Sequence, residues 1–301
     1  MVPGIRVQGR YLVEAGTGKR FHYVGIDAFA LFKRWLMHDG PHALVEPWLA
    51  EVRSYANAGG YSGPIVLRVF RHAAAWNAFH LLPTAYRLPD GTMPQLRAFV
   101  EFCGARDFYV DLTSGDAQEF FSSQSQIQQH VNECCAAVVD LPNIFFQTCN
   151  EPFKNGIDVT IVKPPQWGTL NPLLRDSGAY GESSNWPTGS DLDFIDYHPR
   201  RDATGDPLPL WLTEVFDSAF NLKNHRNKPV RIAEPIGFAE VAIPNRRSND
   251  PRLAGLMGLV AGFCGITLHC DAGMSCDGFG PVQRACAIEY FRGAAGGVRV
   301  G

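Results

Sequence analysis

The amino-acid sequence predicts an α/β protein, a single (β/α)8 barrel domain over residues 1–301. Short runs rich in β-branched and aromatic residues alternate with segments of helical period, which is the pattern of βα units around a parallel sheet. The length of 301 residues suits one such barrel, since these run to roughly 250 residues and often more. No glycine-rich nucleotide-binding motif follows any of the runs, which removes the usual dinucleotide and P-loop interpretations.

Eight strands are expected, and an N-terminal β-hairpin over residues 5–20, with its turn at Ala15–Lys19, precedes them. The fifth strand is the weakest, because it has little apolar content. In order, the strands are Phe21–Asp27, Pro64–Arg71, Asp107–Thr113, Asn143–Cys149, Ser177–Glu182, Leu192–His198, Val230–Glu234 and Gly265–Cys270.

Helices are expected between most of these strands, and the link from the fifth to the sixth is too short for a full one. The glycine-rich segment 293–301 is predicted to be a flexible tail. The helices are Ala43–Asn57, Met93–Cys103, Ala117–Leu141, Gln166–Arg175, Leu210–His225, Pro251–Phe263 and Pro281–Arg292.

Composition limits the classes of partner. The formal net charge of −3 offers no basic field for nucleic acid and no basic amphipathic stretch for a membrane surface. No run approaches the roughly 20 apolar residues of a membrane span, and the N-terminus shows no signal-peptide pattern. A cytoplasmic location is therefore the default, with secretion the alternative if a leader has been removed. The sequence does not define the oligomeric state.

The eight cysteines form no CxxC pair, which disfavours a zinc ribbon or a thioredoxin-like site. Reduced thiols are the default, and a disulfide within the C-terminal group stays open as an alternative. That group is Cys264, Cys270, Cys276 and Cys286. No cofactor and no metal are expected.

The stretch Asn150-Glu151-Pro152 follows the fourth predicted strand directly. Pro152 cannot donate to a β-ladder and disfavours helix at Glu151, so the strand must stop there. In barrels of this type the active site lies at the C-terminal ends of the strands. We therefore interpret Glu151 as a general acid/base and Asn150 as a substrate-binding amide.

A second carboxylate repeats this pattern, because Glu234-Pro235 ends the seventh predicted strand. Strands four and seven face each other across a barrel mouth, so Glu151 and Glu234 could flank one glycosidic bond, with Glu234 as the nucleophile. Glu214 and Glu240 are the alternatives to Glu234.

Other polar residues end strands and are candidate substrate-binding residues. These are Asp27, Arg68, His72, Tyr197, His198, His269 and Asp271. Trp35 and Trp186 are predicted to lie in loops above the mouth, where an aromatic ring can stack on a sugar. The partner implied by this set is an oligo- or polysaccharide.

The sequence resembles the clan A glycoside hydrolases, especially the cellulase-like family 5. The motifs that carry the resemblance span about residues 9–270: Gly9-Arg10-Tyr11-Leu12 with Gly25-Ile26-Asp27, Leu67-Arg68-Val69-Phe70, Asn150-Glu151-Pro152, Asp193–His198, and Lys228-Pro229-Val230 with Glu234. The resemblance implies a retaining mechanism on a β-linked glycan, with Arg68 supporting the nucleophile. The chain departs from the family at Asp27, where Asn is frequent, and at His269-Cys270-Asp271, where a tryptophan usually floors the cleft.

Two other functions remain as alternatives. One is a carbohydrate-binding barrel without catalysis, which the departures from the family pattern motivate. The other is a metal-dependent barrel hydrolase using His198, His269, Asp271 and Asp27. The histidines are scattered and form no HxH or HExxH motif, which disfavours the metal site.

Overall fold

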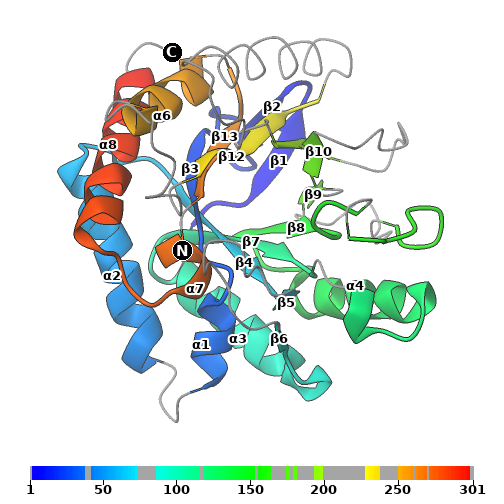
Figure 1. Ribbon diagram of the computed structural model, residues 1–301. Coiled ribbons are helices and arrows are strands. Elements are labelled where there is room, and N and C mark those ends of the chain that lie inside the picture. The colour runs from blue at the N-terminus through cyan, green and yellow to red at the C-terminus, as the bar shows by residue number, and fades with distance from the viewer. Residues whose placement is uncertain are drawn as a thin grey trace, which may run out of the picture.

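The computed structural model describes residues 2–37, 42–73, 86–115, 118–152, 155–163, 174–176, 179–181, 193–198, 228–237, 250–260, 262–269 and 271–298. Parallel strands form one curved sheet, and helices cover its outer side (Figure 1). This arrangement is a (β/α)8 barrel, as the sequence predicts.

Within the described residues the main sheet has nine strands in the order β10-β11-β12-β13-β3-β4-β7-β8-β9, every neighbouring pair parallel. β9 pairs with β8 and β10 pairs with β11, and only two residues separate β9 from β10. The two short strands are therefore the two edges of the curved sheet, and both fall at the fifth barrel position in the chain. The strands are β3 (Tyr23–Asp27), β4 (Ile65–Phe70), β7 (Phe108–Thr113), β8 (Ile144–Gln147), β9 (Leu174–Asp176), β10 (Ala179–Gly181), β11 (Ile195–His198), β12 (Val230–Gly237) and β13 (Gly265–His269).

All eight predicted strand positions are confirmed.

Alternate side chains of each strand point to opposite faces, and here the outward set packs against the helices. Val24 and Ile26 of β3 and Leu67 of β4 belong to this outer core. Because both faces are covered, the strands are nearly continuous apolar runs.

The inward set fills the N-terminal half of the barrel with apolar rings. Tyr23 of β3 lies with its ring centroid 5.5 Å from that of Phe145 on β8, across the interior. Phe194 meets Phe145 edge-on at 5.9 Å. The N-terminal hairpin, β1 (Ile5–Gln8) with β2 (Tyr11–Glu14), adds Ile5 and Leu12 to the same cluster and so plugs this end of the barrel.

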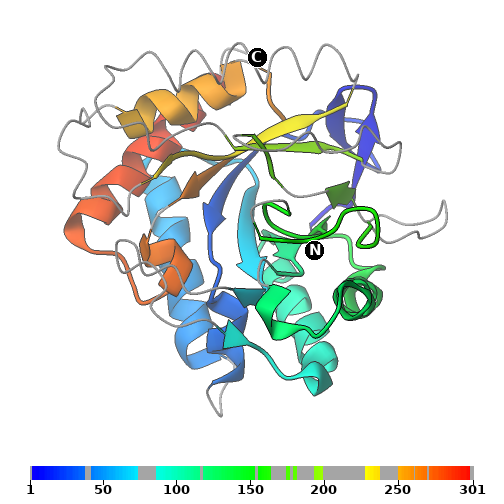
Figure 2. The same ribbon diagram turned by 45° about the vertical axis from the view of Figure 1, so that its right-hand side comes forward.

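The helices pack outside the sheet, and Figure 2 shows α2 and α8 side by side along it. α4 begins later than predicted, because the side chain of Ser123 accepts a hydrogen bond from the Gln126 amide and caps the helix. The long helices are α2 (His42–Ala58), α3 (Met93–Gly104), α4 (Gln124–Val138), α6 (Asp250–Val260) and α8 (Pro281–Val298). Shorter elements are α1 (Leu31–Leu36), α7 (Asp271–Ser275), β5 (His72–Ala73), β6 (Tyr86–Arg87), η2 (Asp90–Thr92) and η3 (Gln118–Phe120).

Three local predictions are wrong. Residues 293–298 are the last turns of α8 rather than a flexible tail, because α6 packs against them so closely that a Cβ at Gly293 would clash with the Arg252 backbone. Residues 174–175 belong to β9 rather than to a helix. The hairpin turns at Gly9, whose φ of 58° suits glycine, while the Ala15–Lys19 turn leads back to an isolated bridge between Val13 and Arg20.

None of the helices in the described part of the chain combines the length and hydropathy of a membrane span.

Cys276 is a buried thiol whose Sγ donates to the Gly273 carbonyl at 3.1 Å, so it takes no part in a disulfide. Cys270, and the predicted helix Leu210–His225, lie outside the described residues.

The hairpin plug can be tested with Phe21→Ala. Phe21 is buried, and its ring centroid lies 4.9 Å from that of Tyr109. Truncation should leave a cavity and lower the free energy of unfolding by about 3–5 kcal/mol, measured by urea denaturation. The exposed Lys19→Ala is the control and should change it by no more than about 0.5 kcal/mol. Equal stability of the two variants would show that the plug does not seal the barrel.

Candidate active site

The C-terminal half of the barrel interior is polar, in contrast to the apolar half below it. Arg231 on β12 is the lowest member of this polar layer and is completely buried. Its Nη1 donates to Asp111 on β7, and its Nη2 donates to Asp196 Oδ2 on β11 at 2.7 Å. β12 and β7 are not neighbours in the sheet, so this pair of bonds crosses the interior.

Gln147 at the end of β8 carries the network onward. Its Nε2 donates to Asp196 Oδ2 at 2.9 Å, while its Oε1 accepts from Thr113 and from Arg68 Nη2 at 3.3 Å. Both ends of the amide are therefore used, with the acceptor toward a cation and the donor toward a carboxylate. Gln147 thus connects the Arg231 cluster to the strand ends above it.

Arg68 on β4 fixes the orientation of Asn150. Its Nη2 donates to Asn150 Oδ1 at 2.7 Å, and Arg68 is fully buried. Because a guanidinium only donates, the amide oxygen must face Arg68, which leaves the Nδ2 hydrogens of Asn150 for another acceptor. The backbone N–H of Asn150 donates to the Gly115 carbonyl at 3.1 Å. Asn150 is therefore held at two points.

Asp27 and His269 form a buried pair on the opposite side of Arg68. His269 Nδ1 bonds Asp27 Oδ2, and Arg68 Nη1 lies 3.9 Å from Asp27 Oδ1. The Phe29 ring lies 6.1 Å from the imidazole. The carboxylate fixes the orientation of the imidazole, which gives the mouth a rigid polar wall built from β3 and β13.

Glu151 follows Asn150 and is half-buried. Its φ of 37° is in the left-handed region, which a non-glycine residue enters only when its surroundings hold it there. Two bonds from Asn155 hold it: the backbone N–H donates to the Glu151 carbonyl at 3.0 Å, and Nδ2 donates to the Asn150 carbonyl at 2.9 Å. A sharp, braced turn therefore presents Glu151 at the strand end.

The strand end of β7 braces this turn from the side. His72 lies so close to Gly115 that any Cβ there would overlap its ring. His130 on α4 contacts the Ser114 carbonyl at 3.3 Å, and the Ser114 side chain donates to the Thr148 carbonyl. His72 is thus a support beneath the Gly115–Asn150 bond, with its ring packed against Phe120, Phe121 and His130.

Trp35 is not in a loop, contrary to prediction. It lies on α1, is 8% exposed, and packs edge-on against Phe99 and Phe102 of α3 at 5.7 and 4.9 Å. Leu31, Phe32 and Trp35 recur with helical spacing, which turns the chain after β3 into a short helix that buries the indole. Trp35 is therefore part of the core.

The backbone of Glu234 lies in β12, and those of Tyr197 and His198 end β11, so all three are on strands that contribute to the mouth. Asp271 opens α7 directly after β13. Trp186, Glu214 and Glu240 lie outside the described residues.

Arg231, Asp196 and Gln147 were not identified as site residues from the sequence. The signal that could have found them is a charged or amide side chain in the middle of a strand that is otherwise apolar on both faces.

The described residues contain no group of three or more His, Cys, Asp and Glu side chains arranged to hold a metal ion. Asp27 and His269, two members of the alternative metal set, are bonded to each other and lie beside the Arg68 cation. A guanidinium next to the carboxylate competes with a metal ion for it, so this pair suits an organic polar ligand better.

Burial shifts the pKa values of two groups near the site. Burial raises the pKa of the Asp111 carboxyl, and the neighbouring Arg231 and Arg68 partly oppose this shift. Burial also lowers the pKa of His72 well below its usual range, and His130, Arg71 and Arg87 lower it further, against a smaller opposing effect of the Ser114 carbonyl. His72 is therefore neutral in the folded protein.

Comparison with solved structures identifies the fold. The chain superposes on an endo-1,4-β-mannanase from Eisenia fetida with a TM-score of 0.61 and 13% identity, covering 97% of this chain and 96% of that one. A family 5 glycoside hydrolase from Bacteroides vulgatus gives 0.58 and 15%, covering 91% and 65%. Gas2p from Saccharomyces cerevisiae, in complex with laminaripentaose, gives 0.51 and 14%, covering 89% and 61%.

The protein therefore has the barrel fold of family 5-like glycoside hydrolases, as the sequence resemblance predicts. It spans less than two thirds of the Bacteroides and yeast chains. No family model matches the sequence, and no curated protein sequence does.

Arg231→Met tests whether the buried network supports the barrel. Removing the cation leaves the Asp111 and Asp196 carboxylates without their guanidinium, which should lower the free energy of unfolding by about 3–5 kcal/mol at pH 7. Replacing both aspartates by asparagine in the same protein should recover part of the loss in urea denaturation. If Arg231→Met is as stable as the parent, the network does not brace the strands.

The neutral state of His72 predicts a pH dependence. Unfolded histidine titrates near ~6.5, whereas folded His72 stays neutral well below that pH, so the unfolded state binds more protons as pH falls. Stability should then drop by up to about 1.4 kcal/mol per pH unit for this residue between pH 6.5 and its folded pKa. Urea denaturation at pH 7.5, 6.5 and 5.5 should show a shallower dependence for His72→Gln than for the parent. Equal slopes would contradict the assignment.

Proposed function

We propose that the protein is a retaining glycoside hydrolase that cleaves a β-linked glycan or β-glycoside, with Glu151 as acid/base and Glu234 as nucleophile. The observation that carries the proposal is the Arg68–Asn150 bond of 2.7 Å in a barrel of glycoside hydrolase fold. It locks an amide donor next to Glu151 at the end of β8, where a sugar hydroxyl would be held during reaction.

The position of Glu234 supports its role. β8 and β12 are three barrel positions apart, so their ends face each other across the mouth. Ala233 pairs with Thr267, and the register with β13 breaks between Ala233 and Gly237. The break begins at Glu234, and such irregularities at barrel rims commonly re-aim a side chain.

The reaction has two steps with one carboxylate in each role. The Glu234 carboxylate attacks the anomeric carbon while the bond to the leaving oxygen breaks, and the Glu151 carboxyl protonates that oxygen. The Glu151 carboxylate then takes a proton from water, whose oxygen bonds the anomeric carbon as the ester to Glu234 breaks. Both carboxyls return to their starting states, and the anomeric configuration is retained.

The remaining candidates are proposed to bind the sugar. The Asp27–His269 pair takes the place in the mouth where an aromatic floor is usual in the family, so hydrogen bonds rather than stacking would define that wall. His72 acts as a support of Asn150 rather than as a direct contact. Tyr197, His198, Asp271 and Trp186 complete the proposed substrate-binding set. The mannanase and the laminaripentaose complex among the structural neighbours favour a β-linked hexose polymer.

Glu151→Gln and Glu234→Gln test the two roles. Loss of the acid/base should lower kcat on a polysaccharide by about 10²–10⁴-fold, and less on aryl glycosides whose leaving group needs no proton. Loss of the nucleophile should lower turnover of both substrates by about 10⁴-fold or more. The exposed Glu101→Gln is the matched control and should be unchanged.

Azide should restore activity to Glu151→Ala and Glu234→Ala, whose shortened side chains leave room for it, with opposite stereochemistry: a β-glycosyl azide forms with Glu151→Ala and an α-glycosyl azide with Glu234→Ala. Full activity of Glu151→Gln on every glycoside would contradict the proposal. Glycan binding without turnover by the parent, surviving both substitutions, would support the non-catalytic barrel instead.

A further inference from the structure

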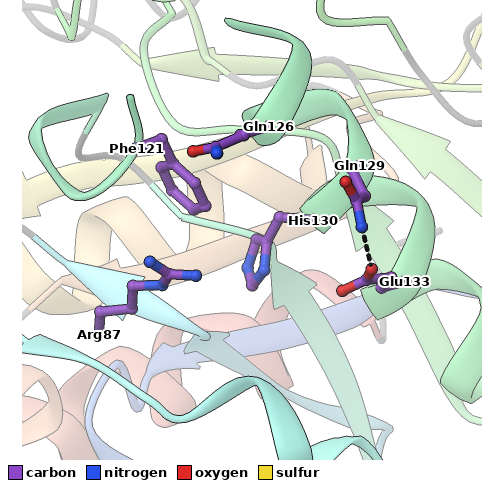
Figure 3. Close-up of a pocket in the computed structure, with 6 residues that line it drawn as sticks. All are labelled: Arg87, Phe121, Gln126, Gln129, His130 and Glu133. Atoms are coloured by element: carbon purple, nitrogen blue, oxygen red, sulfur yellow. Dashed lines mark hydrogen bonds between the residues drawn. The ribbon is translucent and has the colours of Figure 1, made fainter. Parts of the chain in front are cut away.

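A pocket separate from the Arg68–Asn150 cluster opens beside α4, and we call it the α4 pocket. It has a volume of about 400 Å³ and is lined, among the described residues, by Arg87, Phe121, Gln126, Gln129, His130 and Glu133. Figure 3 shows these side chains around one space, with Arg87 and Phe121 on one side, Gln129 and Glu133 on the other, and the His130 ring between them.

The pocket belongs to the same face of the barrel as the candidate active site. Phe121 follows β7, and Arg87 on β6 pairs with His72, which follows β4. Both therefore come from segments that leave the C-terminal ends of strands. His130, at the base of the pocket, contacts the Ser114 carbonyl at the end of β7. A chain that occupies the mouth could extend toward this pocket.

Phe121 lines two pockets. The second, of about 400 Å³, is lined by Glu119, Phe121, Ser122, Ser123, Gln124 and Ile127. The Phe121 ring is half-buried and packs against His72 at 5.1 Å and His130 at 5.3 Å between ring centroids. An aromatic ring held this rigidly costs little conformational entropy when a ligand packs on it.

The polar groups around the ring favour a neutral ligand with many hydroxyls. Gln129 Nε2 donates to Glu133 at 2.8 Å, so its Oε1 remains an acceptor, and Gln126 Oε1 accepts from the Ser122 amide at 3.0 Å, so its Nε2 remains a donor. Arg87 lies over the Phe121 ring at 4.8 Å and donates to the Phe120 carbonyl at 3.1 Å. Its charge is matched in the pocket by that of Glu133, which would repel an anion.

We propose that the α4 pocket is a saccharide-binding subsite that holds a sugar unit of a long glycan by packing it on Phe121, outside the catalytic mouth. The combination of one rigid aromatic ring, two side-chain amides and balanced charge suits a neutral sugar. The substrate class rests on the proposed function, whereas binding at this pocket does not require catalysis.

Calorimetric titration of Glu151→Gln protein with laminaripentaose, cellopentaose and mannopentaose tests the subsite, because this background slows turnover. The expected result is saturable binding by at least one pentasaccharide, weakened about tenfold by adding Phe121→Ala and several-fold by adding Gln129→Ala. Asn132→Ala, an exposed α4 amide that does not line the pocket, is the control and should leave affinity unchanged.

In the parent background, Gln129→Ala should lower kcat/KM on a polysaccharide several-fold and leave kcat/KM on an aryl glycoside unchanged. Because Gln129 is exposed, this variant also keeps the test valid if Phe121→Ala does not fold. Pentasaccharide binding indifferent to both substitutions, or binding of inorganic phosphate in preference to every sugar, would overturn the subsite. Binding that depends on Phe121, without any turnover by the parent, would overturn only the proposed function. Turnover by the parent, with binding that does not depend on Phe121, would overturn only the subsite.

Discussion

The clamp of Arg231 between Asp111 and Asp196 is the interaction on which the upper half of the barrel depends. Three fully buried charges from β12, β7 and β11 meet there, and none can move without leaving another uncompensated in a medium of low polarity. Gln147 bonds both Asp196 and Arg68, and Arg68 in turn bonds Asn150, so the position of Asn150 depends on the cluster below it. The strand ends that carry the site are therefore tied together below the point where the substrate would lie.

The interior is divided into two parts with different physical tasks. The lower part is filled by aromatic rings such as Tyr23 and Phe145 and sealed by the hairpin, so burial of apolar surface stabilises it. The upper part contains charged and amide groups that stabilise little by themselves but fix one geometry. A rigid polar layer on an apolar plug is a suitable base for the proposed pair of carboxylates, which would need a defined separation.

The sequence predicts the strands and their ends well, and the side-chain contacts between strands poorly. Apolar runs and the Glu151-Pro152 stop locate strands and their ends, because strand periodicity and proline chemistry are local properties. Partners such as Arg231 and Asp111 are 120 residues apart in sequence, and only the curvature of the folded sheet brings them together. The spacing of Leu31, Phe32 and Trp35 covers only six residues, which is too short to distinguish a helix from a loop in the sequence. His72 supports this turn only because Gly115 has no side chain and lets the His72 ring approach its Cα. That proximity is a tertiary contact, which the sequence around either residue does not reveal.

The central claim is that Glu151 and Glu234, presented by β8 and β12 across the mouth, act on one bond as a retaining pair. The most direct test is the distance between their carboxyl groups in a crystal structure of the protein. A retaining pair should show about 5–5.5 Å, the separation that allows direct attack at the anomeric carbon. A separation of about 6.5–9.5 Å would indicate an inverting enzyme, and a much larger one would contradict the pairing itself.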